Sequence, residues 1–260
     1  MRINVRGADW HYTISGQGDS VLFLHGGLDS IANHSKLISC LAGDFQVVAV
    51  DRRGHGASTD NGEPFDFPLM AEEVMEFTRK IALPPFHLVG YSDGADIGFH
   101  MASDHPAAVR SLVAISGNYK GINGMSPKWL DMLASFSFAY VREHLPQVLE
   151  QYAAVNPAPD PEAYISKTKA LWDQETVVSG EKLAAITART LLVSGDRDIA
   201  LPEQALEMYA LIPDAALMIL PRSGHGTFVD VAWGPMADAV LPIIKNFLVT
   251  GLAKRGARQS

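Results

Sequence analysis

A serine between two glycines is the first residue whose neighbours suggest chemistry. The segment GYSDG at residues 90–94 follows a short apolar run, residues 86–89, and precedes a helical pattern. A serine on a tight strand-to-helix turn adopts a strained backbone, and flanking glycines let neighbouring backbone pass without a Cβ clash. Its hydroxyl then stands free above the sheet. The pattern predicts that Ser92 is a nucleophile; an ordinary Gly-Ser turn is the alternative.

The same turn predicts where negative charge would be stabilised. The backbone N–H of Asp93 is aimed at the place where an oxyanion would form, and a helix N-terminus favours that charge. A serine hydroxyl is a poor nucleophile near neutral pH. It needs an imidazole to take its proton and a carboxylate to orient the imidazole. Other loops must therefore supply a histidine and an acid.

The elements that must position these groups are short β-branched runs, each ending in a polar residue, Gly or Pro and each followed by a helical pattern. They lie at residues 21–24, 47–50, 86–89, 112–115, 191–193 and 216–220. Such apolar runs, alternating with helices, are typical of parallel strands buried on both faces. The alternating segments 3–5 and 11–14 predict an antiparallel edge hairpin. In such a sheet the ligand site lies beyond the carboxyl ends of the strands.

With this serine turn the chain resembles the α/β-hydrolase family along essentially its whole length. The resemblance runs from an early His-Gly-Gly, residues 25–27, to a late Gly-His, residues 224–225. It implies an α/β fold whose mostly parallel eight-stranded sheet is flanked by helices and carries an inserted helical cap. It also implies a catalytic triad in the chain order nucleophile, acid, base.

The base in the resembling family lies on the loop after the last strand. Here SGHG, residues 223–226, follows the last strand-like run, which makes His225 the candidate. Three other histidines have structural interpretations. His25 is expected to hydrogen-bond its own loop, His55 lies on the family's loop after the fourth strand, and His105 lies at a helix end.

The acid is sought after the penultimate strand, in SGDRD at residues 194–198. Both Asp196 and Asp198 are within reach of that loop. Relatives with this Gly-x-x-Asp spacing use the second aspartate, which favours Asp198. Some relatives use a carboxylate after the sixth strand, but the corresponding loop, residues 116–119, contains no acid. The resemblance thus implies the triad Ser92, Asp198 and His225.

The family takes its second oxyanion donor from a backbone N–H on the loop after the third strand. That loop is HGGL, residues 25–28. Gly27 is the first candidate and Leu28 the second, together with the N–H of Asp93. A plain glycine turn would explain the two glycines equally well without the other motifs.

After residue 118 the strand rhythm stops, and an aromatic-rich helical stretch follows that three prolines at residues 157–161 interrupt. We expect a helical cap at residues 123–188, inserted between two parts of a hydrolase core at residues 1–122 and 189–260. Extra surface helices are the alternative.

Four side chains are candidates for substrate binding. Trp129, Met132 and Phe136 predict an apolar pocket, although packing of the cap on the core would explain them too. Asp93 follows the nucleophile, and at the pocket mouth its carboxylate would attract a substrate ammonium, favouring amino-acyl esters. The alternative is a first-turn aspartate that stabilises its helix, an interpretation that applies to Asp96 too.

Composition excludes several functional classes. The chain has 260 residues, 47% apolar and 19% charged, with a formal net charge of -8, which argues against a nucleic-acid partner. Its one cysteine, Cys40, excludes an intrachain disulfide and a multi-thiolate metal site. The common nucleotide and zinc signatures do not occur, so neither a cofactor nor a metal is expected.

The sequence carries no signal-peptide pattern and no apolar stretch long enough to span a membrane. We therefore expect a soluble cytoplasmic protein with no membrane partner. Three basic residues, Lys254, Arg255 and Arg258, follow the last apolar run and predict a frayed end.

Together these features predict a serine esterase-like hydrolase that cleaves a small-molecule ester, lactone or amide through an acyl-enzyme intermediate. Two alternatives stay open. The same triad serves enol-lactone hydrolysis, carbon–carbon bond hydrolysis or cofactor-free perhydrolysis, and a protein of this fold can sense a small ligand with little turnover. A homo-oligomer is also left open.

Overall fold

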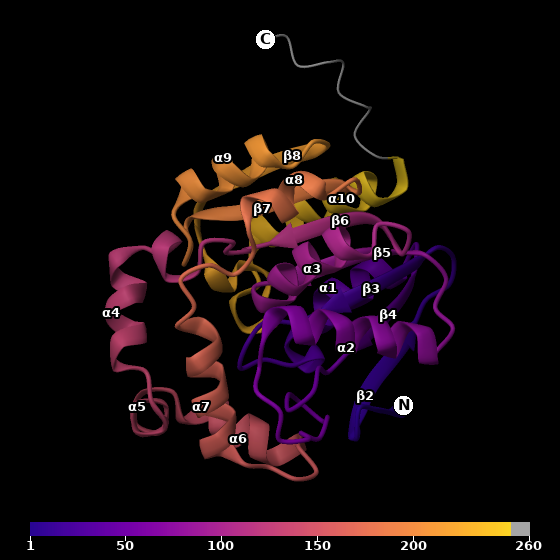
Figure 1. Cartoon of the computed structure of the whole chain (residues 1–260). Coiled ribbons are helices and arrows are strands. Elements are labelled where there is room, and N and C mark those ends of the chain that lie inside the picture. The colour runs from indigo at the N-terminus through magenta and orange to yellow at the C-terminus, as the bar shows by residue number, and fades with distance from the viewer. Residues whose placement is uncertain (251–260) are drawn as a thin grey trace.

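An eight-stranded sheet organises residues 1–250, the part of the chain that the computed structural model describes (Figure 1). The predicted frayed end, with Lys254, Arg255 and Arg258, lies outside the described residues. The strands are β1 (Arg2–Val5), β2 (Ala8–Ser15), β3 (Ser20–Leu24), β4 (Gln46–Val50), β5 (Phe86–Tyr91), β6 (Val109–Ile115), β7 (Arg189–Arg197) and β8 (Ala215–Gly224).

Strand order in the sheet is β1-β2-β4-β3-β5-β6-β7-β8. The pairs β1–β2 and β2–β4 are antiparallel, and the remaining pairs are parallel. Each apolar run singled out in the sequence lies within one of these strands, and the two alternating segments form the edge hairpin. The predicted mostly parallel α/β-hydrolase sheet is confirmed.

Helices connect the strands, and several begin at recognisable signals. They are α1 (Ser35–Ala42), α2 (Phe67–Lys80), α3 (Asp93–Asp104), α4 (Pro127–Ser135), α5 (Phe138–His144), α6 (Pro146–Val155), α7 (Pro161–Trp172), α8 (Gly180–Ala185), α9 (Pro202–Leu211) and α10 (Pro235–Thr250). The Asp66 side chain accepts the Leu69 N–H at the start of α2, and Asp160 accepts the Ala163 N–H at the start of α7. Both are aspartate caps followed by a first-turn proline.

Alternate side chains of the strands pack on opposite faces of the sheet. In β3, Leu22 and Leu24 belong to a core shared with α2, α3, α8 and α9, whereas Val21 and Phe23 belong to a core shared with α1 and α10. All four side chains are fully buried. The continuous apolar runs follow from this arrangement, because both faces of the sheet are covered by helices.

The chain leaves the sheet after β6 and returns to it at β7, and helices α4 to α8 lie between. Helices α4 to α7 gather away from the sheet, while α8 lies beside α3 and α9 (Figure 1). The predicted cap boundaries, residues 123–188, thus include one helix that packs on the sheet domain. The proline-rich break at residues 157–161 falls between α6 and α7.

None of the helices within residues 1–250 is long and apolar enough to cross a membrane. Over the same residues, no three His, Cys, Asp or Glu side chains cluster in a way that could hold a metal ion.

Candidate active site

Ser92 occupies a sharp turn between β5 and α3, with φ +53° and ψ −123°. This left-handed conformation is costly for a residue with a side chain. The flanking glycines make the turn sterically feasible. A Cβ on Gly90 would lie 2.3 Å from the Gly94 carbonyl oxygen, and one on Gly94 would lie 2.3 Å from the carbonyl oxygen of Leu24. The turn therefore requires glycine at both positions.

His225 lies beside this serine, although the two residues are 133 positions apart in the chain. His225 begins a 3-10 turn, η3 (His225–Phe228), directly after β8. Its Nε2 lies 2.9 Å from the Ser92 Oγ, and its Nδ1 lies 2.6 Å from the Asp198 Oδ1. Tyr91 stabilises the position of His225 beside Ser92, because the Tyr91 hydroxyl donates to the His225 carbonyl oxygen at 2.8 Å.

Asp198 is held by several donors at the end of β7. Besides His225, its carboxylate accepts from the Ser116 hydroxyl at 2.7 Å and from the backbone N–H groups of Gly195 and Ile199. Burial alone would raise the pKa of Asp198, but the contacts with His225 and Ser116 outweigh it and lower that pKa. Asp198 therefore stays a carboxylate that can orient the imidazole.

The other aspartate of this loop lies elsewhere. Asp196 is exposed, and its Oδ1 accepts the Ser223 backbone N–H at 3.1 Å. The structure thus places Asp198, and not Asp196, against His225. Sequence reasoning did not find Ser116, which reaches Asp198 across 82 residues. The signal in the sequence is the hydroxyl group of Ser116 itself, directly after the strand that pairs with β7.

The loop after β3 faces the serine turn closely. A Cβ on Gly27 would lie 2.4 Å from the Asp93 Oδ2, and Leu28 adopts a positive φ of 51°. Within residues 1–250, the N–H groups of Gly27, Leu28 and Asp93 donate to no protein acceptor. Three unpaired backbone donors at a serine turn are what an oxyanion site needs.

Buried side chains hold this loop in place. His25 is fully buried, with its Nδ1 2.7 Å from the Gly26 carbonyl oxygen, and its Nε2 accepts the Arg52 backbone N–H at 3.1 Å. The Arg52 guanidinium donates to the Gly26 carbonyl oxygen at 2.7 Å. Burial, together with the Arg52 charge, lowers the pKa of His25 to about 4. His25 is therefore a neutral structural histidine at neutral pH.

The two remaining rival histidines also have structural contacts. His55 is buried, its Nδ1 lies 2.9 Å from the Arg53 carbonyl oxygen, and burial holds its pKa well below the usual value. His105 lies at the end of α3 with its Nε2 2.6 Å from the Glu72 carboxylate. Neither contacts Ser92 in the structure.

A second histidine–carboxylate pair lies behind the site and was missed in the sequence. His34 is fully buried; its Nε2 lies 2.6 Å from the Asp29 Oδ2, and its Nδ1 lies 3.1 Å from the Phe228 carbonyl oxygen. The same Asp29 oxygen accepts the Gly26 N–H at 3.2 Å. Burial opposes ionisation of Asp29, yet the contact with His34 lowers its pKa well below the usual value. The pair links the loop after β3 to the segment that carries His225.

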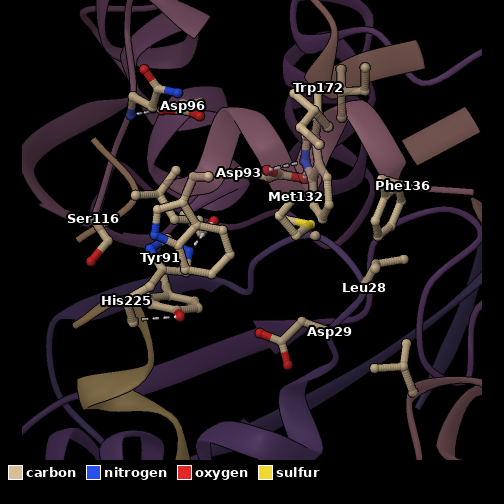
Figure 2. Close-up of a pocket in the computed structure, with 18 of the residues that line it drawn as sticks. Leu28, Asp29, Tyr91, Asp93, Asp96, Ser116, Met132, Phe136, Trp172 and His225 are labelled. Atoms are coloured by element: carbon tan, nitrogen blue, oxygen red, sulfur yellow. Dashed lines mark hydrogen bonds between the residues drawn. The ribbon is translucent and has the colours of Figure 1, made fainter. Parts of the chain in front are cut away.

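Ser92 and His225 open into a cavity of about 610 Å³ (Figure 2). The predicted pocket residues Trp129, Met132 and Phe136 all line it, as does Asp93. Its wall is mainly apolar and includes the further residues Met125, Leu133, Val148, Leu171, Trp172, Val177 and Ile199. Apolar walls with a few polar groups are typical of small-molecule sites.

Asp93 does not stand free at the pocket mouth. Its side chain is 4% exposed, and both carboxylate oxygens lie within hydrogen-bond reach of the Trp172 indole N–H, as Figure 2 shows. Burial raises the pKa of Asp93, against the opposing effects of the Arg52 cation and the Trp172 hydrogen bond.

A strained serine turn after a central parallel strand, with a histidine after the last strand, defines the class of α/β hydrolases. Comparison with known sequences agrees, because the sequence profile of the alpha/beta hydrolase fold matches residues 19–151. The chain belongs to this family.

Two relatives have names that describe hydrolysis. Pyrrolizixenacetamide deacetylase of Xenorhabdus hominickii is 32% identical over 115 residues, which are 44% of this chain and 43% of the deacetylase. A protein of Klebsiella pneumoniae (strain 342), named provisionally as a carbamate hydrolase, is 25% identical over 275 residues, covering 95% of this chain and 99% of its own. The alignment thus spans less than half of the deacetylase but nearly all of the second relative.

Among solved structures, the enol-lactonase from Burkholderia xenovorans LB400 is similar with a TM-score of 0.74 and 20% identity, over 95% of this chain and 99% of that chain. This likeness shows the fold. The family match and the names of these relatives indicate a hydrolytic enzyme.

Proposed function

We propose that this protein is a serine hydrolase that cleaves an ester, lactone or amide of a small molecule through an acyl-enzyme intermediate. One observation carries the proposal: His225 contacts the Ser92 Oγ at 2.9 Å through one ring nitrogen and the Asp198 carboxylate at 2.6 Å through the other. An imidazole held by a carboxylate on one side can take a hydroxyl proton on the other.

In the first half-reaction the Ser92 Oγ bonds to the substrate carbonyl carbon while its proton passes to the His225 Nε2. The carbonyl oxygen becomes an oxyanion, which the N–H groups of Asp93 and Gly27 receive, with Leu28 as the second candidate on that loop. Each such donor lowers the barrier by about 3 kcal/mol.

Collapse of this intermediate breaks the bond to the leaving alcohol or amine, which takes the proton from His225. A water molecule then gives a proton to His225 and attacks the acyl carbon. The second collapse releases the acid and restores the Ser92 hydroxyl. Asp198 holds the imidazole in the required orientation throughout and remains a carboxylate.

The cavity supports a preference for substrates with a medium-length or aromatic apolar group. Trp129, Met132 and Phe136 lie along its wall, and the Trp129 and His225 ring centroids are 6.3 Å apart. An acyl chain that packs against these side chains would be removed from water as its carbonyl group reaches Ser92. Burial of each methylene group contributes about 0.8 kcal/mol to binding.

The direct test is labelling with a fluorophosphonate probe, followed by mass mapping of the modified residue. We expect the label on Ser92. Ser92→Ala should abolish hydrolysis of p-nitrophenyl acetate while its circular dichroism and Tm stay unchanged. Ser103→Ala is a matched control, because Ser103 lies on α3 and donates to the His100 carbonyl oxygen. Turnover by Ser92→Ala equal to that of the unmodified protein would refute the proposal.

Product analysis separates this reaction from the alternatives on the same triad. Carbon–carbon bond cleavage, enol-lactone hydrolysis and perhydrolysis each give a product that simple ester hydrolysis does not. Slow, single-turnover kinetics with every ester, together with tight ligand retention, would instead indicate a small-ligand sensor of this fold.

A further inference from the structure

Asp96 lies in the wall of the cavity one helical turn after the nucleophile. Its backbone N–H donates to the Ser92 carbonyl oxygen at 3.1 Å, and its side chain is 4% exposed (Figure 2). The Asp96 Oδ1 accepts the Asn118 backbone N–H at 2.7 Å. Its other oxygen, Oδ2, has no hydrogen-bond partner among residues 1–250. One side of this carboxyl group is therefore fixed by a hydrogen bond, and the other has no protein partner among the described residues.

Asn118 adds a second unpartnered polar atom at the same place. It also lines the cavity and is 8% exposed. Its Nδ2 donates to the Gly121 carbonyl oxygen at 3.1 Å, whereas its Oδ1 has no partner among the described residues. A buried polar atom without a partner is costly, so the Asn118 Oδ1, in the residue whose N–H donates to Asp96, marks a polar part of the cavity wall.

The surroundings favour a neutral acid at this position. No ion pair to Asp96 forms within residues 1–250. Burial raises the pKa of Asp96 well above its usual value, and the negative charge of Asp93 raises it further. The Asn118 hydrogen bond and the Arg52 charge act in the opposite direction. A protonated carboxyl group offers one O–H donor, and Oδ2 is the oxygen free to carry it.

We propose that Asp96, with Asn118 beside it, forms a polar subsite that binds a neutral oxygen-bearing group of the substrate's acyl chain. The group is a carbonyl, ether or hydroxyl oxygen that accepts a hydrogen bond from the Asp96 carboxyl group. This inference rests on the proposed ester hydrolysis, because it specifies the acyl group that reaches Ser92.

A neutral oxygen fits this end of the cavity better than an ammonium. The other lining residues include Leu171 and Val177, which offer nothing to a cation that has lost its hydration. Asp93 also lines the cavity, but both of its oxygens face the Trp172 N–H. Pairing with an ammonium would also require the Asp96 carboxyl group to lose its proton. A carbonyl oxygen instead accepts a hydrogen bond from the protonated carboxyl group.

The test compares p-nitrophenyl hexanoate with its 4-oxo and 5-oxo derivatives. We expect the unmodified enzyme to prefer one oxo derivative by about 10-fold in kcat/KM, the value of one hydrogen bond in a buried site. Asp96→Asn should keep this preference, because the asparagine amide can donate where the acid donates and still accept the Asn118 N–H. Asp96→Leu should lose the preference, measured as the ratio of kcat/KM for the oxo derivative to kcat/KM for hexanoate. Asp104→Asn, on the same helix but outside the cavity, is the control and should match the unmodified enzyme.

Direct binding keeps this inference separate from the proposed function. The Ser92→Ala variant is titrated calorimetrically with methyl hexanoate and the methyl oxohexanoates, so that affinity is measured without turnover. Tighter binding of one oxo ester, lost when Asp96→Leu is added, supports the subsite even if no ester is hydrolysed.

Three results would overturn the subsite. One is equal kcat/KM and equal affinity for the oxo and parent esters, and a second is loss of the oxo preference in Asp96→Asn. A third is a preference for p-nitrophenyl 6-aminohexanoate that Asp96→Asn removes, which would assign an ammonium to this carboxyl group. If Asp96→Leu fails to fold, Asp96→Ala, which also lacks a donor, replaces it in both the kinetic and the binding experiment.

Discussion

The Trp172 indole N–H lies 3.0 Å from the Asp93 Oδ1 and 3.3 Å from the Oδ2, so the last residue of α7 contacts the first residue of α3. The same indole stacks obliquely on Phe136, with ring centroids 5.3 Å apart. A Cβ on Gly27 would touch both Trp172 and Asp93. The predicted cap, the nucleophile turn and the loop after β3 therefore pack as one unit.

This contact predicts the result of changing Asp93. Because both oxygens face Trp172 and burial raises the pKa of the carboxyl group, we expect Asp93 to contribute little to the binding of a substrate ammonium. In Asp93→Asn, the ratio of kcat/KM for an aminoacyl p-nitrophenyl ester to that for its des-amino analogue should change by less than about twofold. A large loss confined to the aminoacyl ester would instead support the cation preference considered from the sequence.

The two aspartates of the loop after β7 should differ sharply. Asp198→Asn removes the carboxylate that orients His225 and should lower kcat for p-nitrophenyl acetate by about 10⁴-fold. Asp196→Asn is the matched control, because Asp196 is exposed and bonds only backbone, and it should keep kcat within about threefold. Steady-state kinetics on both variants decide. Equal effects would contradict the role proposed for Asp198.

The fold and the pairing of Ser92 with His225 were predictable because their signals are local. A run of buried residues marks each parallel strand, and the glycines at 90 and 94 mark the only kind of residue that this turn accommodates. The resemblance to the α/β-hydrolase family then favours His225 among nine histidines. The same resemblance, through the Gly-x-x-Asp spacing of relatives, favours Asp198 over Asp196, and the structure brings Asp198 to the imidazole.

Other contacts have no local signature. Ser116 reaches Asp198 across 82 residues, and Trp172 reaches Asp93 across 79. The sequence allows Asp96 to be a first-turn aspartate that stabilises its helix, whereas its burial in a cavity wall depends on how α3 meets the loop after β6. Such relationships arise from the packing of distant segments, which periodicity and spacing do not describe.

The burial of His25 makes folding stability depend on pH. The pKa of His25 is about 4 in the folded protein and 6.5 without burial. Between pH 4 and pH 6.5 the unfolded chain therefore binds a proton that the folded protein does not bind. The contribution of His25 is therefore present above pH 6.5 and is lost as the pH falls from 6.5 towards 4, by up to about 3 kcal/mol.

Urea denaturation of the unmodified protein and of His25→Asn at pH 7 and pH 5 measures this effect. Asparagine keeps a donor near the Gly26 carbonyl oxygen but does not titrate. The unmodified protein should lose more of its free energy of unfolding between the two pH values than His25→Asn does. Parallel losses in the two proteins would rule out His25 as the titrating group.

The buried pair of His34 and Asp29 should affect both stability and catalysis. The His34 ring satisfies both of its contacts, to Asp29 and to the Phe228 carbonyl oxygen, only when each ring nitrogen carries a proton. His34→Phe keeps the ring beside Tyr91 but leaves a buried carboxylate without its partner. We expect a loss of about 3 kcal/mol in the free energy of unfolding.

The pair connects the Gly26 N–H to the segment that carries His225. Its removal should therefore also make the position of the oxyanion donors relative to His225 less fixed. We expect kcat to fall about tenfold with KM nearly unchanged, since positioning acts on the transition state more than on binding. His105→Phe is the control: its Nε2 is also 2.6 Å from a carboxylate, that of Glu72, but this pair is partly exposed and should contribute less than about 1 kcal/mol. A His34→Phe enzyme that loses stability yet keeps its kcat would show that the pair holds the fold together without positioning the site.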